Sequence, residues 1–230
     1  VAIGGGITQD ITCFLASTMF RGLDWIFYPT TLLAQSDSCI GSKSSINSGK
    51  IKNILGTFTP PKNIVLDVSF LDSLEKKDLH SGIGEMIKVH AINSKDSFNH
   101  IKKYFLEILQ NKKVMEGFIY DSLLFKKELI EIDEFDTGPR NVMNYGHSFG
   151  HAIETATNYE IPHGIAVTIG MDMANYVAFN LGVTSEEHFK RMHPLLEDNS
   201  SLYRKTCIDP ELLLAALAKD KKNTSTQLRL

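Results

Sequence analysis

The pattern of apolar residues changes near residue 68 of this 230-residue chain. Before that point the expected strands are 1–3, 25–28 and 64–68, with an amphipathic helix over 11–19. After it, apolar residues recur at helical spacing, and the expected helices are 81–92, 100–110, 113–132, 141–157, 165–181 and 210–218. The sequence therefore predicts an α/β domain of nucleotide-binding type over residues 1–68, followed by an all-α domain over 69–230.

Composition excludes several classes of protein. With 43% hydrophobic and 22% charged residues, the chain is neither disordered nor fibrous. A net charge of −3 with scattered lysines predicts no nucleic-acid partner, and no apolar run is long enough to predict a membrane span. Three cysteines at unrelated spacings, Cys13, Cys39 and Cys207, are typical of reduced buried thiols, so we expect a cytoplasmic protein.

Both ends of the sequence predict an internal piece of a longer protein. The chain begins at Val1 inside an apolar run and stops at Leu230, where an alternating segment has just begun. Because strands of a parallel sheet need neighbours on both sides, we expect the α/β domain to be partial.

Three histidines predict a metal site in the helical domain. His147 and His151 are four residues apart and share one helix face, and His163 follows shortly after. Such pairs also occur on surfaces and in cores, but Glu85 lies in another apolar segment and could supply an oxygen ligand. Two imidazoles and one carboxylate would leave a coordination position open. The spacing alone does not say which two histidines bind.

The α/β domain contains polar segments that suit anions. Gly4-Gly5-Gly6 stands between a strand and a helix, where a pyrophosphate can approach the backbone, although the usual G-x-G-x-x-G spacing is absent and a tight turn is favoured. Asp10 and the pair Thr30-Thr31 offer polar groups nearby, or serve as helix surface and N-cap.

Residues 35–53 are small, polar and lysine-bearing, which suits an anion cradle or a solvated loop. Lys88 is three residues after Glu85 on the same helix face, so an inward Glu85 brings an inward lysine that needs an anion.

Several motifs occur in order along nearly the whole chain: VAIGGGITQD, FRGLDWIFYPTTLLAQSDSCIGSKSSIN, KNILGTFTPPKNIVLD, SGIGEMIKVHAI and NYGHSFGHAIE with PHG. In these motifs the chain resembles 3-dehydroquinate synthase and its sugar phosphate cyclase relatives. The resemblance implies a partial Rossmann-like NAD-binding domain and a helical metal-binding domain. It also implies a homodimer that uses NAD and a divalent metal, normally Zn²⁺ with Co²⁺ as an alternative. The reaction would turn a seven-carbon keto acid sugar phosphate into 3-dehydroquinate and phosphate.

The resemblance also assigns roles residue by residue. The metal ligands would be Glu85, His147 and His163, with His151 facing the phosphate and moving protons. The phosphate side would include Lys43, Asn53 and Lys88, and Arg21 would reach the neighbouring subunit's site. Lys126 and Arg140 would clamp the substrate carboxylate, Asn144 would bind a hydroxyl, and Asp37 and Lys222 would lie on the substrate side. The NAD side would comprise Gly5, Gly6, Asp10, Thr30, Thr31, Asp37, Lys52 and Ser73.

Departures from the family pattern leave alternatives open. Gln9 replaces a usual glycine, which would add a side chain near the pyrophosphate, and Asp136 replaces a usual glutamate; Ser42 and Ser45 also differ. One alternative is a related cyclase acting on sedoheptulose 7-phosphate or another sugar phosphate, against which the pair Lys126 and Arg140 argues. Others are a metal-dependent alcohol dehydrogenase of the iron-containing type and a non-catalytic relative.

Overall fold

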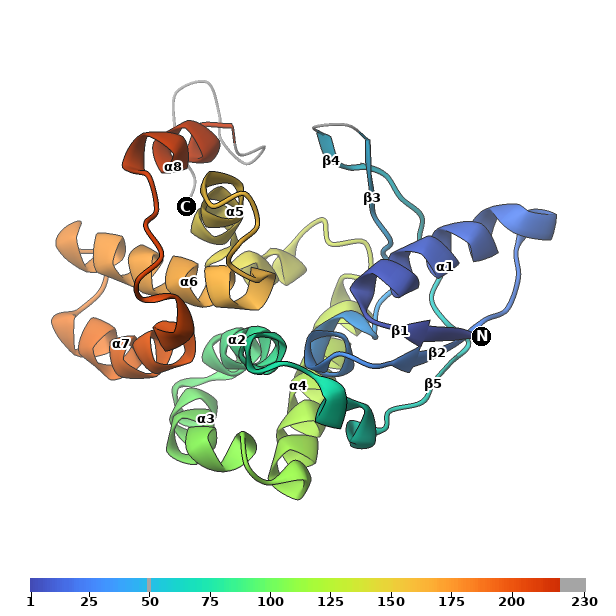
Figure 1. The fold of residues 1–230 in the computed structure, drawn as a ribbon, viewed down its shortest axis with the longest axis horizontal. Helices are drawn as coiled ribbons and strands as arrows, with labels where there is room; N and C mark the ends of the chain where they lie inside the picture. Colours follow the sequence, from blue (N-terminus) through green and yellow to red (C-terminus); the bar gives the residue numbers. More distant parts are fainter. Residues whose placement is uncertain (49–50, 220–230) are drawn as a thin grey trace. The chain divides into compact units, whose positions relative to one another are not determined.

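The computed structural model describes residues 1–48 and 51–219, with side chains described outside 47–54. In the α/β part the elements are β1 (Ala2–Gly4), α1 (Gly6–Thr18), η1 (Met19–Arg21), β2 (Ile26–Pro29), η2 (Ala34–Ser38), β3 (Ile46–Ser48), β4 (Ile51–Leu55), β5 (Asn63–Ile64) and η3 (Val68–Ser73). Helices follow: α2 (Lys76–Asn93), α3 (Lys95–Ile108), α4 (Lys112–Ile132), η4 (Pro139–Asn144), α5 (His147–Ala156), α6 (His163–Asn180), α7 (Glu186–Ser200), η5 (Ser201–Tyr203) and α8 (Pro210–Leu217) (Figure 1). Among the described residues, no helix is both long and apolar enough to cross a membrane.

The chain divides into two compact units, and the division falls inside α2 and α3. The first unit comprises Val1–Gly82 and Leu106–Asn141, and the second comprises Ile83–Phe105 and Val142–Leu230. The boundary predicted after residue 68 followed the change in secondary structure, whereas the units follow packing. In particular, α4 packs against η2 and so belongs with the α/β unit.

The α/β unit is built on a three-stranded parallel sheet in the order β1-β2-β5. Ala2 pairs with Phe27 across β1 and β2, and Ile26 pairs with Asn63 across β2 and β5. Helix α1 packs on the sheet through Cys13 and Ala16, which join a buried cluster with strand residues such as Phe27 (Figure 1). This is the Rossmann-like arrangement of a crossover helix between parallel strands that the sequence predicts.

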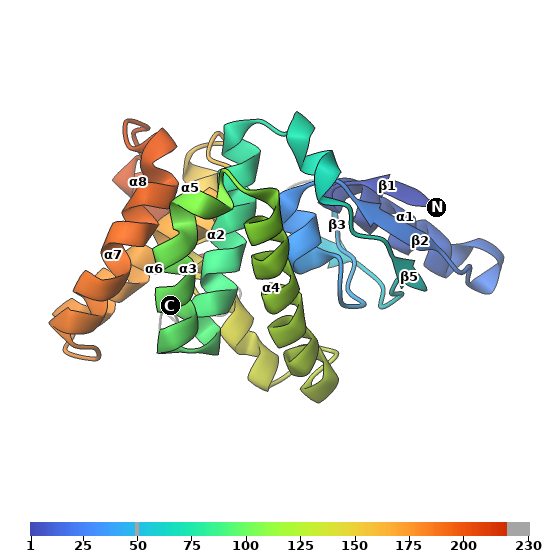
Figure 2. The same ribbon diagram turned by 90° about the horizontal axis from the view of Figure 1, so that it is seen from below.

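The helical unit consists of α5 to α8 with the later parts of α2 and the earlier part of α3. Helix α6 contacts both α5 and α7, and α8 contacts α5 (Figure 2). Because α6 is packed on several sides, its apolar residues do not form a single stripe, and Ile165, Val167 and Met171 are all fully buried. Helix α7 begins at a Ser185 cap, whose hydroxyl accepts a hydrogen bond from the His188 amide.

Three differences from the sequence-based expectations have local causes. The helix expected over 141–157 begins only at His147, because Gly146 adopts a left-handed φ of 77° between η4 and α5. Helix α7 was not predicted, since its sequence is polar and contains Pro194. The antiparallel pair β3 and β4 lies in a segment interpreted only as a loop or cradle.

Close backbone contacts set the spacing of the helices in the helical unit. A Cβ placed on Gly84 of α2 would stand 2.1 Å from the carbonyl oxygen of Gly164 in α6. A Cβ on Gly170 of α6 would stand 2.2 Å from the carbonyl oxygen of Gly146 at the start of α5. Any larger residue at these positions would force the helices apart.

Gly170→Ala is therefore expected to lower the free energy of unfolding by about 1–3 kcal/mol or more, because the new methyl group overlaps a backbone carbonyl. Gly117→Ala in α4 is the matched control, since its Cβ would meet no atom within 4 Å and should stabilise the protein by roughly 0.5–1 kcal/mol. Urea denaturation measures both changes. A stabilising Gly170→Ala would show that α5 and α6 are not held at backbone contact.

Candidate metal centre and anion-binding cluster

A carboxylate and two imidazoles meet in the helical unit. Glu85 of α2, His147 of α5 and His163 of α6 each offer a ligand atom, and these atoms all lie within 4.8 Å of one another. Glu85 Oε1 is 3.5 Å from His163 Nε2 and 3.9 Å from His147 Nε2. Ligands on tetrahedral zinc lie roughly 3.3 Å apart, given bonds of about 2.0–2.2 Å. The donor set and its spacing therefore fit a divalent metal.

Both rings are held with Nε2 facing Glu85. His147 Nδ1 lies 3.2 Å from the carbonyl oxygen of Tyr145, and His163 Nδ1 lies 3.2 Å from Glu154 Oε1. A carbonyl or an ionised carboxylate can only accept a hydrogen bond, so each Nδ1 is the donor, and in the neutral ring Nε2 keeps its lone pair. This is the tautomer that a metal ligand needs.

The charges around the triad act differently on the two rings. Burial, with the positive charge of Lys88 and the neighbouring His163, lowers the pKa of His147 well below its usual value. Burial also tends to lower the pKa of His163, but the hydrogen bond to Glu154 and the negative charge of Glu85 raise it overall. His147 is thus a neutral ligand at ordinary pH.

Lys88 is buried beside Glu85, as the three-residue spacing predicts. Its Nζ lies 2.5 Å from Glu85 Oε2, and both side chains are at most 3% exposed. The inward lysine therefore has a carboxylate partner on its own helix. His151, one turn after His147, stacks its ring 5.8 Å from that of His163.

The α/β unit gathers three cations around residues 37–43. We refer to Lys43, Lys126 and Arg140 as the basic cluster. Lys126 Nζ lies 2.5 Å from both the side-chain Oδ1 and the backbone oxygen of Asp37, and Lys43 Nζ lies 2.6 Å from Asp136. Lys126 is only 7% exposed, so it is not the solvated helix charge that its position on α4 would otherwise allow. Each lysine of the cluster thus faces one carboxylate.

Arg140 is held by the loop that precedes it. Asp133 accepts hydrogen bonds from the amides of Thr137, Gly138 and Arg140 itself, which lower the pKa of that carboxyl. The Arg140 Nη1 donates to the Glu134 carbonyl oxygen at 2.7 Å. Its Nη2 lies only 3.3 Å from where a Cβ on Gly41 would be, so the glycine leaves room for the guanidinium. Sequence reasoning missed Asp133 as the organiser of this loop.

The glycine turn between β1 and α1 is closely packed at Gly5 and open at Gly6. A Cβ on Gly5 would stand 2.9 Å from Thr31 Cγ2, whereas one on Gly6 would meet no atom within 4 Å. Thr31 Oγ1 lies 3.3 Å from the Ala34 amide, whose hydrogen bond it accepts, which is the capping role considered for the threonine pair. Thr30 is partly buried and its amide donates to the Gly4 carbonyl oxygen.

Two polar side chains of α1 bind within the α/β unit. Asp10 Oδ1 accepts a hydrogen bond from the Ser45 amide at 3.0 Å, while burial raises the pKa of Asp10. Gln9 is buried and bonds Ser38 twice, through the backbone oxygen at 2.6 Å and the hydroxyl at 2.8 Å. The Gln9 amide is thus bonded to η2, and its effect on a pyrophosphate at this turn stays a prediction.

The remaining predicted residues are dispersed. Arg21 and Ser73 are exposed, and Asn144 is partly buried at the end of η4. Phe20 and Arg21 both have positive φ, 50° and 66°, a costly conformation for residues with a Cβ. The side chains of Lys52 and Asn53, and the whole of Lys222, lie outside the described residues. Of the cysteines, Cys13 and Cys39 are buried as expected, whereas Cys207 is exposed.

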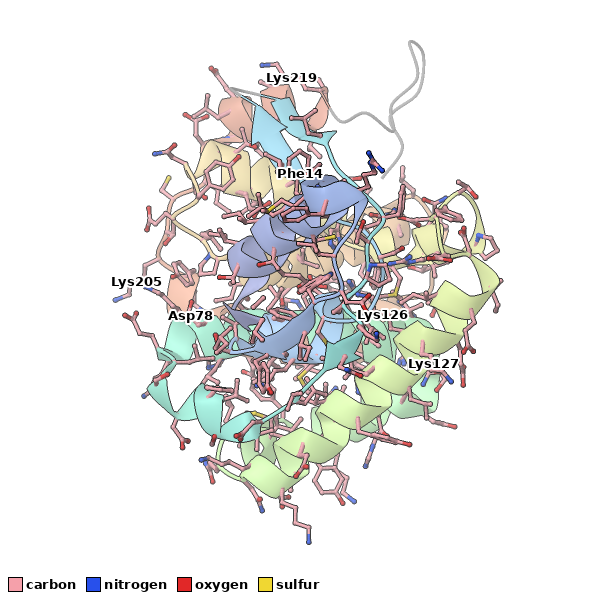
Figure 3. All side chains as sticks on the ribbon, turned by 90° about the vertical axis from the view of Figure 1, so that its right-hand side faces the viewer. Phe14, Asp78, Lys126, Lys127, Lys205 and Lys219 are labelled. Carbon is pink, nitrogen blue, oxygen red and sulfur yellow. The ribbon has the colours of Figure 1, made fainter. Side chains whose placement is uncertain are left out.

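Replacement of Lys126 tests whether the basic cluster is part of the packed interior. Lys126→Met should lower the free energy of unfolding on the order of 3 kcal/mol, because it leaves Asp37 buried without its ammonium partner. Lys127→Met, one residue along α4 (Figure 3), removes only an exposed pair with Glu131 and should cost about 0.3–0.5 kcal/mol. Thermal and urea denaturation compare the two; equal losses would contradict a buried Lys126.

Solved structures place the chain in a structural class. It matches 2-epi-5-epi-valiolone synthase from Streptomyces hygroscopicus subsp. jinggangensis, solved with NAD⁺ and Zn²⁺ bound, at a TM-score of 0.83 and 27% identity, over 94% of this chain and 61% of that one. It also matches 2-deoxy-scyllo-inosose synthase, complexed with carbaglucose-6-phosphate, NAD⁺ and Co²⁺, at a TM-score of 0.85 and 27% identity. This match covers 100% of this chain and 63% of that one. A likeness to sulfoacetaldehyde reductase from Bifidobacterium kashiwanohense, at a TM-score of 0.60 and 15% identity, extends to the fold alone. The fold is that of the sugar phosphate cyclases.

Sequence comparison narrows this class to one family. The 3-dehydroquinate synthase N-terminal family matches residues 1–81, and the 3-dehydroquinate synthase C-terminal family matches residues 82–223. Named 3-dehydroquinate synthases from Thermoanaerobacter sp. and Helicobacter pylori are each 38% identical, over 99% and 100% of this chain. The chain belongs to the 3-dehydroquinate synthase family. It spans 65% and 66% of the length of these two relatives.

Proposed function

We propose that the protein containing this chain is a 3-dehydroquinate synthase, a lyase of the shikimate pathway. It would convert 3-deoxy-D-arabino-heptulosonate 7-phosphate to 3-dehydroquinate and inorganic phosphate. The observation that carries this proposal is the basic cluster, in which Lys126 and Arg140 are both buried, in a chain 38% identical to named 3-dehydroquinate synthases. A guanidinium fork beside an ammonium suits a carboxylate, and the substrate of this reaction is a carboxylic acid.

The helical unit would hold the metal through Glu85, His147 and His163. When bound, the metal would act as a Lewis acid on the substrate's hydroxyl and carbonyl oxygens, and NAD would accept a hydride from the substrate alcohol and later return it. The residues around the triad would orient the substrate. Lys88, already beside Glu85, offers a donor to a substrate oxygen, and His151 is the candidate to bind the phosphate and carry a proton as it leaves.

The α/β unit would supply the anion contacts. Lys43 would exchange Asp136 for the substrate phosphate, and Lys126 would share its ammonium between Asp37 and the carboxylate. Gly5 and Gly6 would admit the pyrophosphate of NAD at the start of α1, where helix amides favour negative charge. The protein would be a homodimer, with the exposed Arg21 completing the partner's site.

Substrate choice tests the carboxylate role. Phosphate release by the protein from the complete open reading frame, with NAD and Zn²⁺, is expected from the seven-carbon keto acid phosphate and not from sedoheptulose 7-phosphate. Arg140→Ala should lower kcat/KM for the acid about 10–200-fold, mainly through KM, because a charge-assisted pair is worth roughly 1.5–3 kcal/mol. Release from sedoheptulose 7-phosphate alone, which has no carboxylate, would identify a related cyclase, the second candidate favoured by the solved structures with TM-scores of 0.83 and 0.85.

Removal of a ligand tests the metal centre. His163→Ala is expected to abolish both bound metal and turnover, since a carboxylate and one imidazole remain. Metal content after dialysis, measured by atomic emission on folded protein, gives the answer without reference to activity. Full metal content in His163→Ala would show that the ligand assignment is wrong.

A further inference from the structure

His163 faces two carboxylates at once, and only one of them belongs to the metal triad. Its Nε2 lies 3.5 Å from Glu85 and its Nδ1 lies 3.2 Å from Glu154 Oε1. The two ring nitrogens therefore contact different carboxylates: Nε2 faces Glu85 and Nδ1 faces Glu154. Glu85 stands on the side where a metal would bind, and Glu154 stands on the opposite side of the same ring.

Glu154 is built into the helical unit rather than added at its surface. It follows His147 by seven residues and His151 by three on α5, so all three project from one face of the helix. The Glu154 side chain is 9% exposed. An exposed carboxylate could reach the ring from many rotamers, whereas a buried one fixes the ring in one orientation.

The histidine on α5 is fixed in a different way. His147 Nδ1 donates to the carbonyl oxygen of Tyr145, two residues before it, so the local backbone sets its tautomer. His163 is the first residue of α6, and its Nδ1 is oriented by the side chain of another helix. A single substitution can therefore release the His163 ring and leave the His147 ring in place.

We propose that Glu154 is a positioning residue for the metal centre: its carboxylate holds His163 as the Nδ1–H tautomer, with Nε2 aimed at the site shared with Glu85 and His147. The charge also makes the imidazole a stronger donor toward a cation. This inference rests on the proposed metal site. Carboxylate partners of metal-ligating histidines typically change metal affinity about 10–100-fold when removed.

Co²⁺ and Zn²⁺ binding to the metal-free, full-length protein tests the inference. Glu154→Ala is expected to weaken both metals about 10–100-fold by competition against a chelator of known affinity. Glu154→Gln keeps an acceptor oxygen in nearly the same volume, so it should orient the ring and lose only the contribution of the charge, with an intermediate affinity. Glu187→Gln is the matched control, because this glutamate of α7 is 83% exposed and should bind metal as the unmodified protein does.

A second measurement separates ring orientation from general loss of structure. The ¹⁵N shifts of the His163 ring in metal-free protein should report a proton on Nδ1, and in folded Glu154→Ala they should report a mixture of the two tautomers. Wild-type affinity and an unchanged tautomer in Glu154→Ala would overturn the proposal.

A rival role for Glu154 would give a different result. His151, Glu154 and His163 also bring ligand atoms within 4.8 Å of one another, so Glu154 could itself be a ligand of a second ion. Two ions per chain, one of them lost in both Glu154→Ala and His151→Ala while the other keeps its affinity, would overturn the positioning role. One ion per chain with unchanged affinity in His151→Ala would support it. If His163→Ala binds metal as tightly as the unmodified protein, the proposed metal site itself fails.

Discussion

The spacing of Glu85, His147 and His163, the proposed metal ligands, depends on backbone contacts between helices that leave no space for a side chain. Gly84 lies against the Gly164 carbonyl, and the residues next to these two glycines are Glu85 and His163. Gly170 lies against Gly146, which directly precedes His147. Each of these close contacts therefore involves a glycine that directly adjoins a proposed ligand in the sequence. Because the helices touch at these points, three side chains of ordinary length can bring their donor atoms within 4.8 Å.

Charge is distributed differently in the two units, and each distribution suits a ligand of opposite sign. Around the triad there are two carboxylates, Glu85 and Glu154, and one lysine, Lys88. The Nδ1 atoms of His147 and His163 each have a hydrogen-bond partner, which leaves Nε2 on the side of Glu85. In the basic cluster, Lys126 faces Asp37 and Lys43 faces Asp136, while the Arg140 guanidinium donates to a backbone carbonyl oxygen. The carboxylates around the triad suit a cation, and the lysines and the guanidinium of the basic cluster suit an anion.

Local sequence pattern was enough to predict the elements that carry the site but not the contacts within it. The spacing of His147 and His151 predicted a shared helix face, and the apolar runs predicted α2, α4 and α6 with small errors at their ends. Glu154 continues the same face by a further turn and could have been found from that spacing. The pairing of Lys126 with Asp37, 89 residues away, depends on how α4 packs against η2, which no local pattern reveals. Burial of Gln9 against Ser38 was missed for the same reason.

Two of the four departures from the family pattern, Gln9 and Asp136, make contacts within the α/β unit. Gln9, in α1, directs its amide toward Ser38 in η2 and forms two hydrogen bonds inside the α/β unit. Asp136 has a φ of 57°, a conformation that the short aspartate side chain tolerates better than most, and from there it reaches Lys43 at 2.6 Å. A longer glutamate would not keep the same contact from the same backbone without bending back. Asp136 therefore holds Lys43 within the α/β unit, while Glu85, His147 and His163 are all present in the helical unit.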